Sequence, residues 1–200
     1  TLTADSPLIR VDYEYKIHEN RMTPSIITPW VINGTTVVGE VNRIFLPLSD
    51  GIFDQPYNPS GPPFHQRFFY NPARSWQATI GQKSKAGLAM TMDLSRVMAF
   101  YMWFGAHNNT MEWMYNSFKV PHGKSLQMSH ELIPCHGLES VAGVGGGIVA
   151  GLDVPETKIG EATDVTVNVF NASAGELLLK VGCKKLPGRL AEITHTQRLS

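Results

Sequence analysis

The sequence predicts an all-β protein built from antiparallel strands. Between residues 88 and 94, leucines and methionines alternate with residues that are small or polar. The segment 9–17 alternates in the same way, with isoleucine, valine and tyrosine set against charged residues. A period of two places one row of side chains in a core and the other row outside. No segment has a convincing helical pattern longer than two turns.

The first half of the chain contains strand patterns separated by turn residues. Strands are expected, in order, at 8–18, 24–32, 35–48, 64–70 and 76–80. The dipeptide Asn33-Gly34 predicts a tight hairpin turn between the second and the third of these strands. The segment 49–63 contains four prolines, which cannot donate hydrogen bonds to a strand ladder. A long loop is therefore expected there.

The second half of the chain continues the series. Further strands are expected at 88–94, 97–104, 110–120, 125–133, 163–170 and 177–181. The segment 97–104 is apolar on both faces, which is typical of a strand buried between two layers, and a short helix starting after Asp93 is the alternative. The segment 142–151 is too rich in glycine for a stable regular element. We place a boundary near Gly151, which gives domains of residues 1–151 and 152–200.

The composition argues against some classes of partner. Hydrophobic residues make up 42% of the chain, enough for a packed core, and charged residues make up 17%, below the usual value of about 25%. Sparse charge suggests that some faces are covered by other sheets or by a partner. The formal net charge is zero, which argues against nucleic-acid binding and against an anionic membrane surface. No run approaches the ~18 apolar residues of a membrane helix.

The cysteines and histidines do not form a recognisable metal motif. Cys135 and Cys183 are far apart in the sequence, and two buried thiols are favoured over a single disulfide. His130 and His136 are six positions apart, whereas the helical zinc motif needs a spacing of four, and Pro134 would break the helix. We therefore expect no metal.

The glycine run does not predict a nucleotide site. The glycines between 143 and 147 are not followed by Lys-Ser or Lys-Thr, so the phosphate-binding loop is absent. A flexible connection or a close backbone crossing is the expected role of this run. We therefore expect no cofactor.

Four sequence stretches resemble the galactose-mutarotase-like β-supersandwich superfamily, whose folds occur in aldose epimerases and in domains of glycoside hydrolases and polysaccharide lyases. In order, they are LIRVDYEYKIHEN, TPWVINGT, WQATIGQKSKAGLAMTMD and TMEWMYNSFKVPHGKSLQMSHEL. The resemblance covers about two-thirds of the chain, from Leu8 to Leu138, and implies the later part of an antiparallel supersandwich. The tail from Asp153 resembles immunoglobulin-like or adhesion-type modules through GEATDVTVNVFNAS, which implies a small β-sandwich segment.

The chain departs from the epimerase pattern at one decisive position. Sugar epimerases place a histidine at the end of the re-entrant strand, where it protonates the ring oxygen. Here that position resembles Pro29-Trp30. Catalysis by proton transfer needs a group that titrates near the working pH, and an indole does not. No epimerase activity by this route is expected.

Tryptophans are the first candidates for a binding site. Sugars present flat CH faces that stack on exposed aromatic rings, and binding grooves combine such rings with a few polar groups. Trp30 is favoured because it replaces the catalytic position and lies beside prolines, and Trp76 is a second candidate. The alternative for each tryptophan is a place in the core, which is favoured for Trp113.

The proline-rich loop and the residues after it supply further candidates. Tyr57, His65, Arg67 and Tyr70 lie in or just after this segment. Tyrosine, histidine and arginine together could neutralise a uronate carboxylate and move a proton, as a polysaccharide lyase requires. The alternative is a structural flap that covers a sheet edge.

We expect a non-catalytic accessory β-sandwich that binds a glycan or oligosaccharide through these residues. The chain begins without methionine and almost inside a strand, which indicates a segment of a larger carbohydrate-active protein that contacts neighbouring domains. The expected location is extracellular or periplasmic. Two alternatives stay open: a catalytic polysaccharide lyase or glycoside hydrolase domain, and a purely structural sandwich between domains.

Overall fold

The predicted all-β class is confirmed. The computed structural model describes residues 2–3, 6–17, 24–35, 40–57, 65–104, 109–156, 164–172, 177–182 and 194–199. Within these ranges the chain forms strands and one three-residue 3-10 turn, η1 (Leu94–Arg96). No helix in the described ranges is long and apolar enough to cross a membrane.

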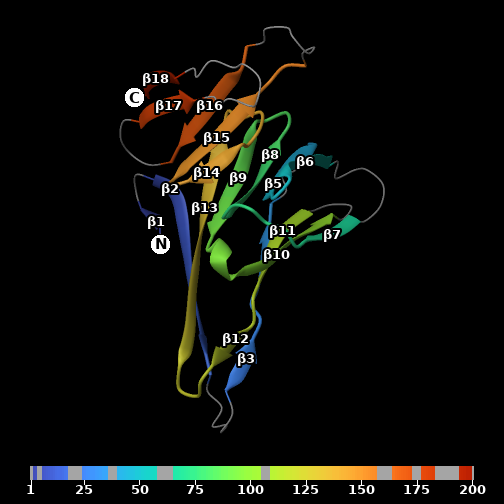
Figure 1. The fold of residues 1–200 in the computed structure, drawn as a ribbon, viewed down its shortest axis with the longest axis vertical. Coiled ribbons are helices and arrows are strands. Elements are labelled where there is room, and N and C mark those ends of the chain that lie inside the picture. The colour runs from blue at the N-terminus through green and yellow to red at the C-terminus, as the bar shows by residue number, and fades with distance from the viewer. Residues whose placement is uncertain are drawn as a thin grey trace.

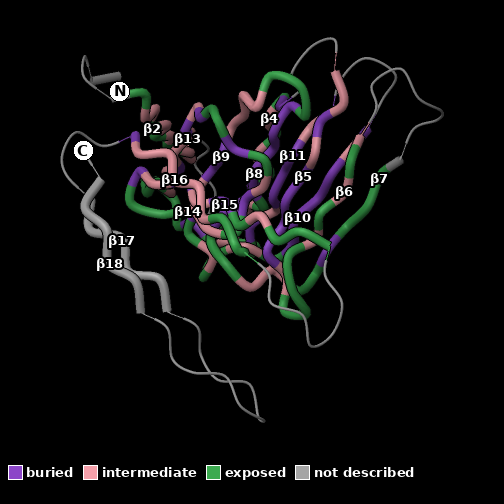
Figure 2. The backbone as a smooth tube through the Cα atoms, turned by 90° about the horizontal axis from the view of Figure 1, so that it is seen from above, coloured by how far each residue is buried: buried purple, intermediate pink, exposed green. Residues whose placement is uncertain are grey.

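Two antiparallel sheets form the body of the molecule (Figure 1). The larger has the order β1 (Leu2–Thr3), β2 (Ser6–Lys16), β13 (Ser125–His136), β9 (Ala86–Met92), β8 (Trp76–Gly81), β5 (Asn42–Leu48), β6 (Gly51–Tyr57). The smaller has the order β4 (Trp30–Gly34), β11 (Asn109–Tyr115), β10 (Val97–Phe104), β7 (His65–Phe69). In Figure 2 the buried backbone runs through β5, β8, β10 and β11, in the middle of the two sheets. The segment 97–104 is a strand, as the sequence predicts, but only one of its faces lies in a core, and the expected place between two layers is wrong.

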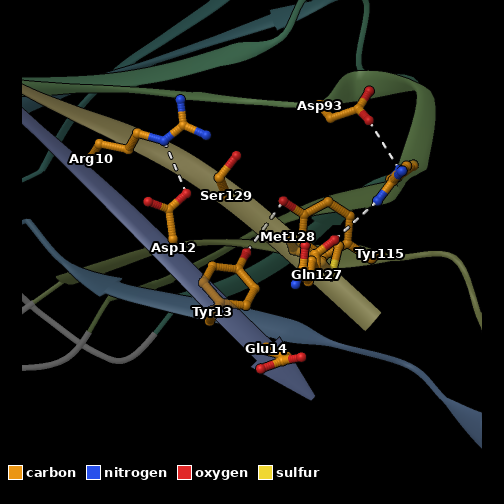
Figure 3. Close-up of a pocket in the computed structure, with 10 residues that line it drawn as sticks. Arg10, Asp12, Tyr13, Glu14, Asp93, Tyr115, Gln127, Met128 and Ser129 are labelled. Carbon is orange, nitrogen blue, oxygen red and sulfur yellow. Dashed lines mark hydrogen bonds and ion pairs between the residues drawn. The ribbon is translucent and has the colours of Figure 1, made fainter. Parts of the chain in front are cut away.

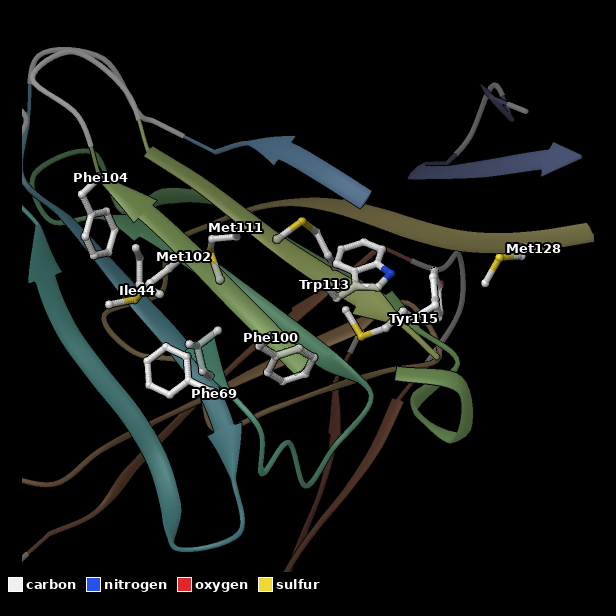
Figure 4. Close-up of a cluster of buried hydrophobic side chains, with 12 residues drawn as sticks. Ile44, Phe69, Phe100, Met102, Phe104, Met111, Trp113, Tyr115 and Met128 are labelled. Atoms are coloured by element: carbon white, nitrogen blue, oxygen red, sulfur yellow. The ribbon is translucent and has the colours of Figure 1, made fainter. Parts of the chain in front are cut away.

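The main core lies between these two sheets (Figure 4). Ile44 and Leu46 of β5 enter it from the larger sheet, and Phe100 and Trp113 enter it from the smaller one. All four side chains are fully buried. Because side chains alternate along a strand, the residues between them must point to the opposite faces.

A second core covers the other face of the larger sheet. Phe45 of β5, Trp76 of β8 and Ile133 of β13 pack there with Val149. Val149 belongs to a three-stranded sheet of β14 (Gly143–Gly145), β15 (Ile148–Asp153) and β16 (Thr166–Asn171). The larger sheet is thus the central layer of three. The expected domain boundary at Gly151 falls inside β15, and residues on both sides of it share this core.

The expected hairpin at Asn33-Gly34 is wrong. Strand β4 continues through Gly34 and stays paired with β11, opposite Thr110. Thr35 extends the same pairing, because its N–H donates to the carbonyl of Asn109 at 3.2 Å. The next described strand, β5, belongs to the other sheet. The ladder to β11, distant in sequence, overrides the local turn preference of the dipeptide.

The proline-rich segment is also more regular than expected. Residues 51–57 form β6, which pairs with β5 after a turn at Ser49-Asp50. Pro56 lies opposite Arg43 in this ladder. It is tolerated because β6 is the edge of the sheet, where a missing N–H faces no further strand. The remainder of the expected loop, residues 58–63, lies outside the described ranges.

The glycine run forms a hairpin instead of an irregular connection. Strands β14 and β15 pair across Gly146 and Gly147. These two residues have φ values of 59° and 79°, the left-handed backbone that two-residue hairpin turns require. Glycine supplies the turn here, while Val149 and Val144 pack against the second core. The abundance of glycine therefore marks a tight turn between strands.

Three features complete the described chain. β3 (Ser25–Ile27) pairs with β12 (Phe118–Val120), and β17 (Leu177–Gly182) pairs with β18 (Thr194–Leu199). Cys135 is a buried free thiol, in agreement with the expectation for this residue. Cys183 lies outside the described ranges.

Candidate functional site

The outer face of the smaller sheet is rich in aromatic side chains. Phe100 of β10 and Trp113 of β11 point into the main core. The residues that alternate with the core residues along each strand therefore face outward. In register across the four strands, Ile32 lies opposite Glu112, Glu112 opposite Tyr101, and Tyr101 opposite Phe68. One row of side chains therefore crosses the whole outer face.

Four aromatic rings on this face touch one another. Trp30 and Tyr101 meet edge to face with centroids 5.5 Å apart, and Phe68 lies 4.5 Å from Tyr101 and 6.1 Å from Trp30. Tyr70, just beyond β7, stacks on Phe68 at 5.9 Å with 15° between the ring planes. We call Trp30, Tyr101, Phe68 and Tyr70 the aromatic face. Trp30 is 42% exposed and Tyr70 is 70% exposed, so the face is open to solvent.

Polar groups lie between and beside these rings. The Tyr101 hydroxyl donates to Oε1 of Gln66 at 2.8 Å. The Thr110 hydroxyl donates to Oε1 of Glu112 at 2.5 Å. Burial raises the pKa of the Tyr101 hydroxyl, and the nearby negative charge of Glu112 raises it further. This phenol therefore stays protonated and able to donate at any physiological pH.

A hydrogen bond from the larger sheet holds the backbone of Glu112 in place. Gln77 of β8 is fully buried, and its side-chain amide donates to the carbonyl oxygen of Glu112 at 2.9 Å. This bond links the two large sheets through the core. It holds β11, and with it the middle of the outer face, against a rigid support.

Two of the predicted binding residues come together in this way. Trp30 and Tyr70 both belong to the aromatic face, joined by Phe68 and Tyr101. The sequence interpretation did not single out Phe68, Tyr101 or Glu112. The sequence signal for them is the alternation along each strand, because they lie between residues that point into the core.

The other predicted residues lie elsewhere. The guanidinium of Arg67 lies over the rings of Phe69 and Phe53, 4.8 Å and 5.6 Å from their centroids. Phe69 is a core residue, so Arg67 points to the side of β7 opposite Phe68. Tyr57 is half-buried and stacks on the core residue Phe104 at 4.5 Å. The side chain of His65 lies outside the described part.

Trp76 is wrong as a binding residue. Its side chain is only 3% exposed and packs in the second core, beneath the three-stranded sheet. A ring enclosed on both faces has no surface left on which a sugar can stack. Trp76 does lie in a strand, as predicted, but the sheet of β14, β15 and β16 covers the face to which its side chain points.

A polar hollow lies along β2 and β13 (Figure 3). Its volume is about 530 Å³. The charged groups that line it already have partners: Arg10 pairs with Asp12 at 2.9 Å, Arg96 with Asp93 at 3.1 Å, and Glu14 with Lys16 at 3.0 Å. A charged ligand would have to displace these partners, so the hollow is a weaker candidate than the aromatic face.

Histidines and acidic residues do not gather into a metal site in the part of the chain that the structure describes. The ring of His130 packs against Trp113 at 5.1 Å, whereas His136 contacts Phe170 of β16 at 5.1 Å. The two imidazoles therefore contact side chains of different sheets, which lie on opposite sides of the larger sheet.

The chain was compared with protein families, with curated proteins and with solved structures. No protein-family model matches the chain, and no curated protein matches it. A solved structure with some similarity is that of the Slr1438 protein from Synechocystis sp. PCC 6803, with a TM-score of 0.45 and 9% sequence identity. The match covers 66% of this chain and 51% of that protein, so the chain spans about half of its length.

Proposed function

We propose that this chain is a non-catalytic, carbohydrate-binding β-sandwich that holds a glycan on the aromatic face. The observation that supports it most directly is the line of ring contacts from Trp30 through Tyr101 and Phe68 to Tyr70. Rings held in contact on a rigid sheet form a platform whose shape exists before a ligand arrives.

The chemistry of the face suits sugars. Exposed aromatic rings in contact are uncommon on a soluble surface and mark a place of interaction. The CH faces of a pyranose stack on such rings, while sugar hydroxyls need nearby donors and acceptors. Gln66 and Thr110 provide those groups at the margins of the rings. A ligand that is apolar on its faces and polar at its edges matches this surface.

The position of Arg67 favours a binder over a polysaccharide lyase. A lyase would need a cation and a proton-transfer group within hydrogen-bond reach of one uronate. Arg67 lies over Phe69 on one side of β7, whereas Tyr70 stacks on Phe68 on the other side. These two residues cannot act together on one sugar without a rearrangement of the strand.

Binding can be tested by affinity electrophoresis in gels that contain neutral polysaccharides such as xylan, mannan, glucan or galactan. Wild type should be retarded by at least one polymer, and Tyr70→Ala should lose most of this retardation. Leu152→Ala removes an exposed apolar side chain from β15, on a different sheet, and serves as the matched control.

Two results would overturn the proposal. The first is the absence of retardation by every polymer in the series. The second is a stable dimer in sedimentation that Tyr70→Ala dissociates, because the face would then be an interface between proteins.

A further inference from the structure

Glu112 is the distinctive group of the outer face. Apart from His65, the four strands of the smaller sheet contain only two charged residues, Glu112 and Arg67. Arg67 lies on the core side of β7, over Phe69. The outer face therefore has a single formal charge among its described side chains, and this charge is negative.

The negative charge of Glu112 is weakly screened. Glu112 is only 5% exposed, and its cross-strand neighbours are the apolar Ile32 and the ring of Tyr101. The described contacts give it a hydroxyl partner, Thr110, and no ion pair with a cation. Salt screens a buried charge much less than an exposed one. Its field therefore reaches a ligand on the face with little loss.

The neighbouring phenol already responds to this charge. The pKa of Tyr101 is raised first by desolvation and then by the negative charge of Glu112. Tyr101 lies at the centre of the aromatic face, in contact with both Trp30 and Phe68. A ligand stacked on these rings would be exposed to the same field.

We propose that Glu112 makes the aromatic face selective for neutral glycans and excludes acidic ones; this rests on the proposed carbohydrate-binding function. Neutral sugars carry no charge, so the field of the buried carboxylate does not repel them. Uronate or sulfate groups bring a second negative charge and no donor, so the same carboxylate repels them. The selection is made by charge at one position and is independent of which hexose is stacked.

The test uses a neutral polymer that wild type retains and the carboxymethyl derivative of the same polymer. Wild type should bind the neutral form at least about tenfold more tightly than the derivative at low salt. Glu112→Gln keeps the size of the side chain and an acceptor for the Thr110 hydroxyl. It should reduce this preference to about threefold or less, because only the charge is removed.

A second pair of variants keeps the test independent of the buried substitution. Ile32 is 65% exposed and lies directly opposite Glu112, so Ile32→Lys places a cation beside the carboxylate on a tolerant surface position. This variant should also lose the preference for the neutral polymer. Ile32→Gln, which changes polarity without charge, should retain it.

The outcomes separate the two proposals. Equal binding of both polymers by wild type, or an unchanged preference in Glu112→Gln and Ile32→Lys, overturns the selectivity and leaves carbohydrate binding standing. Absence of binding to either polymer overturns both. Because a buried charge is screened little, a wild-type preference that survives an increase in salt from about 20 to about 500 mM supports Glu112 as its origin, whereas a preference that salt abolishes would assign it to exposed charges and overturn the role of Glu112.

Discussion

Trp30 and Tyr101 meet edge to face, with ring centroids 5.5 Å apart and ring planes at 88° to each other. Trp30 is on the edge strand β4, and Tyr101 is on β10, two strands away in the same sheet. The indole therefore leans across β11 to reach the phenol. A tryptophan held in this way is ordered although it is partly exposed, which lowers the entropy that a ligand must remove.

Trp30→Ala should weaken glycan binding without unfolding the protein. Losing one well-placed ring at a binding site costs about 1–3 kcal/mol of binding free energy. Trp113→Ala is the contrasting variant, because Trp113 is fully buried in the main core and its removal should cost about 3–5 kcal/mol of folding free energy. Thermal melts and titration of the retained glycan measure both effects. Loss of the melting transition in Trp30→Ala would show that Trp30 is needed for folding, and would contradict its role as a binding residue.

Trp76→Ala should affect stability alone. The ring lies in the second core with Phe45 and Val149, so its truncation should cost about 3–5 kcal/mol of unfolding free energy. Tyr70→Ala, at an open position, should change the same quantity by less than about 0.5 kcal/mol. Urea denaturation followed by fluorescence compares the two. Similar midpoints for both variants would contradict the burial of Trp76.

The sequence predicts much of the strand content because alternation is a local property. The alternation in β2 and β9 is visible within the short segments 9–17 and 88–94, without knowledge of the strands that pair with them. Trp30 and Tyr70 could be selected because each stands near prolines or at the end of a strand. Tyr101 could not, because residues 97–104 are apolar on both faces and do not indicate which row is exposed.

The remaining errors come from pairing between segments distant in sequence. Asn33-Gly34 has the local chemistry of a turn, yet β11 holds it in an extended ladder. Trp76 has the character of a binding tryptophan, yet β14–β16, more than 60 residues later, cover it. The outcome in both cases depends on which strands become neighbours, and this information is absent from the local sequence.

Gly87→Ala should be strongly destabilising. A Cβ atom at this position would lie 2.1 Å from the carbonyl oxygen of Thr79 on the neighbouring strand β8. Backbone cannot move away cheaply in the central sheet, so the β8–β9 pairing would have to open, with a loss of at least about 1–3 kcal/mol. Gly34→Ala is the matched control, because no atom lies within 4 Å of the point that its added methyl group would occupy. Equal melting temperatures for the two variants would contradict the close approach of β8 and β9.

His130 should make the protein less stable in mild acid. The residue is 6% exposed, and its ring contacts Trp113 and Tyr13 at 5.1 Å and 5.7 Å. Burial disfavours the charged imidazolium, so the pKa of His130 in the folded protein lies below the ordinary value of 6.5. Between the two values the unfolded chain binds a proton that the folded chain does not bind.

The sign of the effect follows from this difference in bound protons. Above pH 6.5 the imidazole is neutral in both states and contributes no pH dependence. As the pH falls below 6.5, stability is lost until the folded pKa is passed, and the loss then stops. His130→Phe removes the titrating group and should flatten this part of the stability profile between pH 7.5 and 5. Urea midpoints measured at intervals of half a pH unit compare the two proteins, and an NMR titration of the His130 ring gives its folded pKa directly. Parallel stability profiles, or a folded pKa at or above 6.5, would show that the ring is hydrated and that this part of the core is open to water.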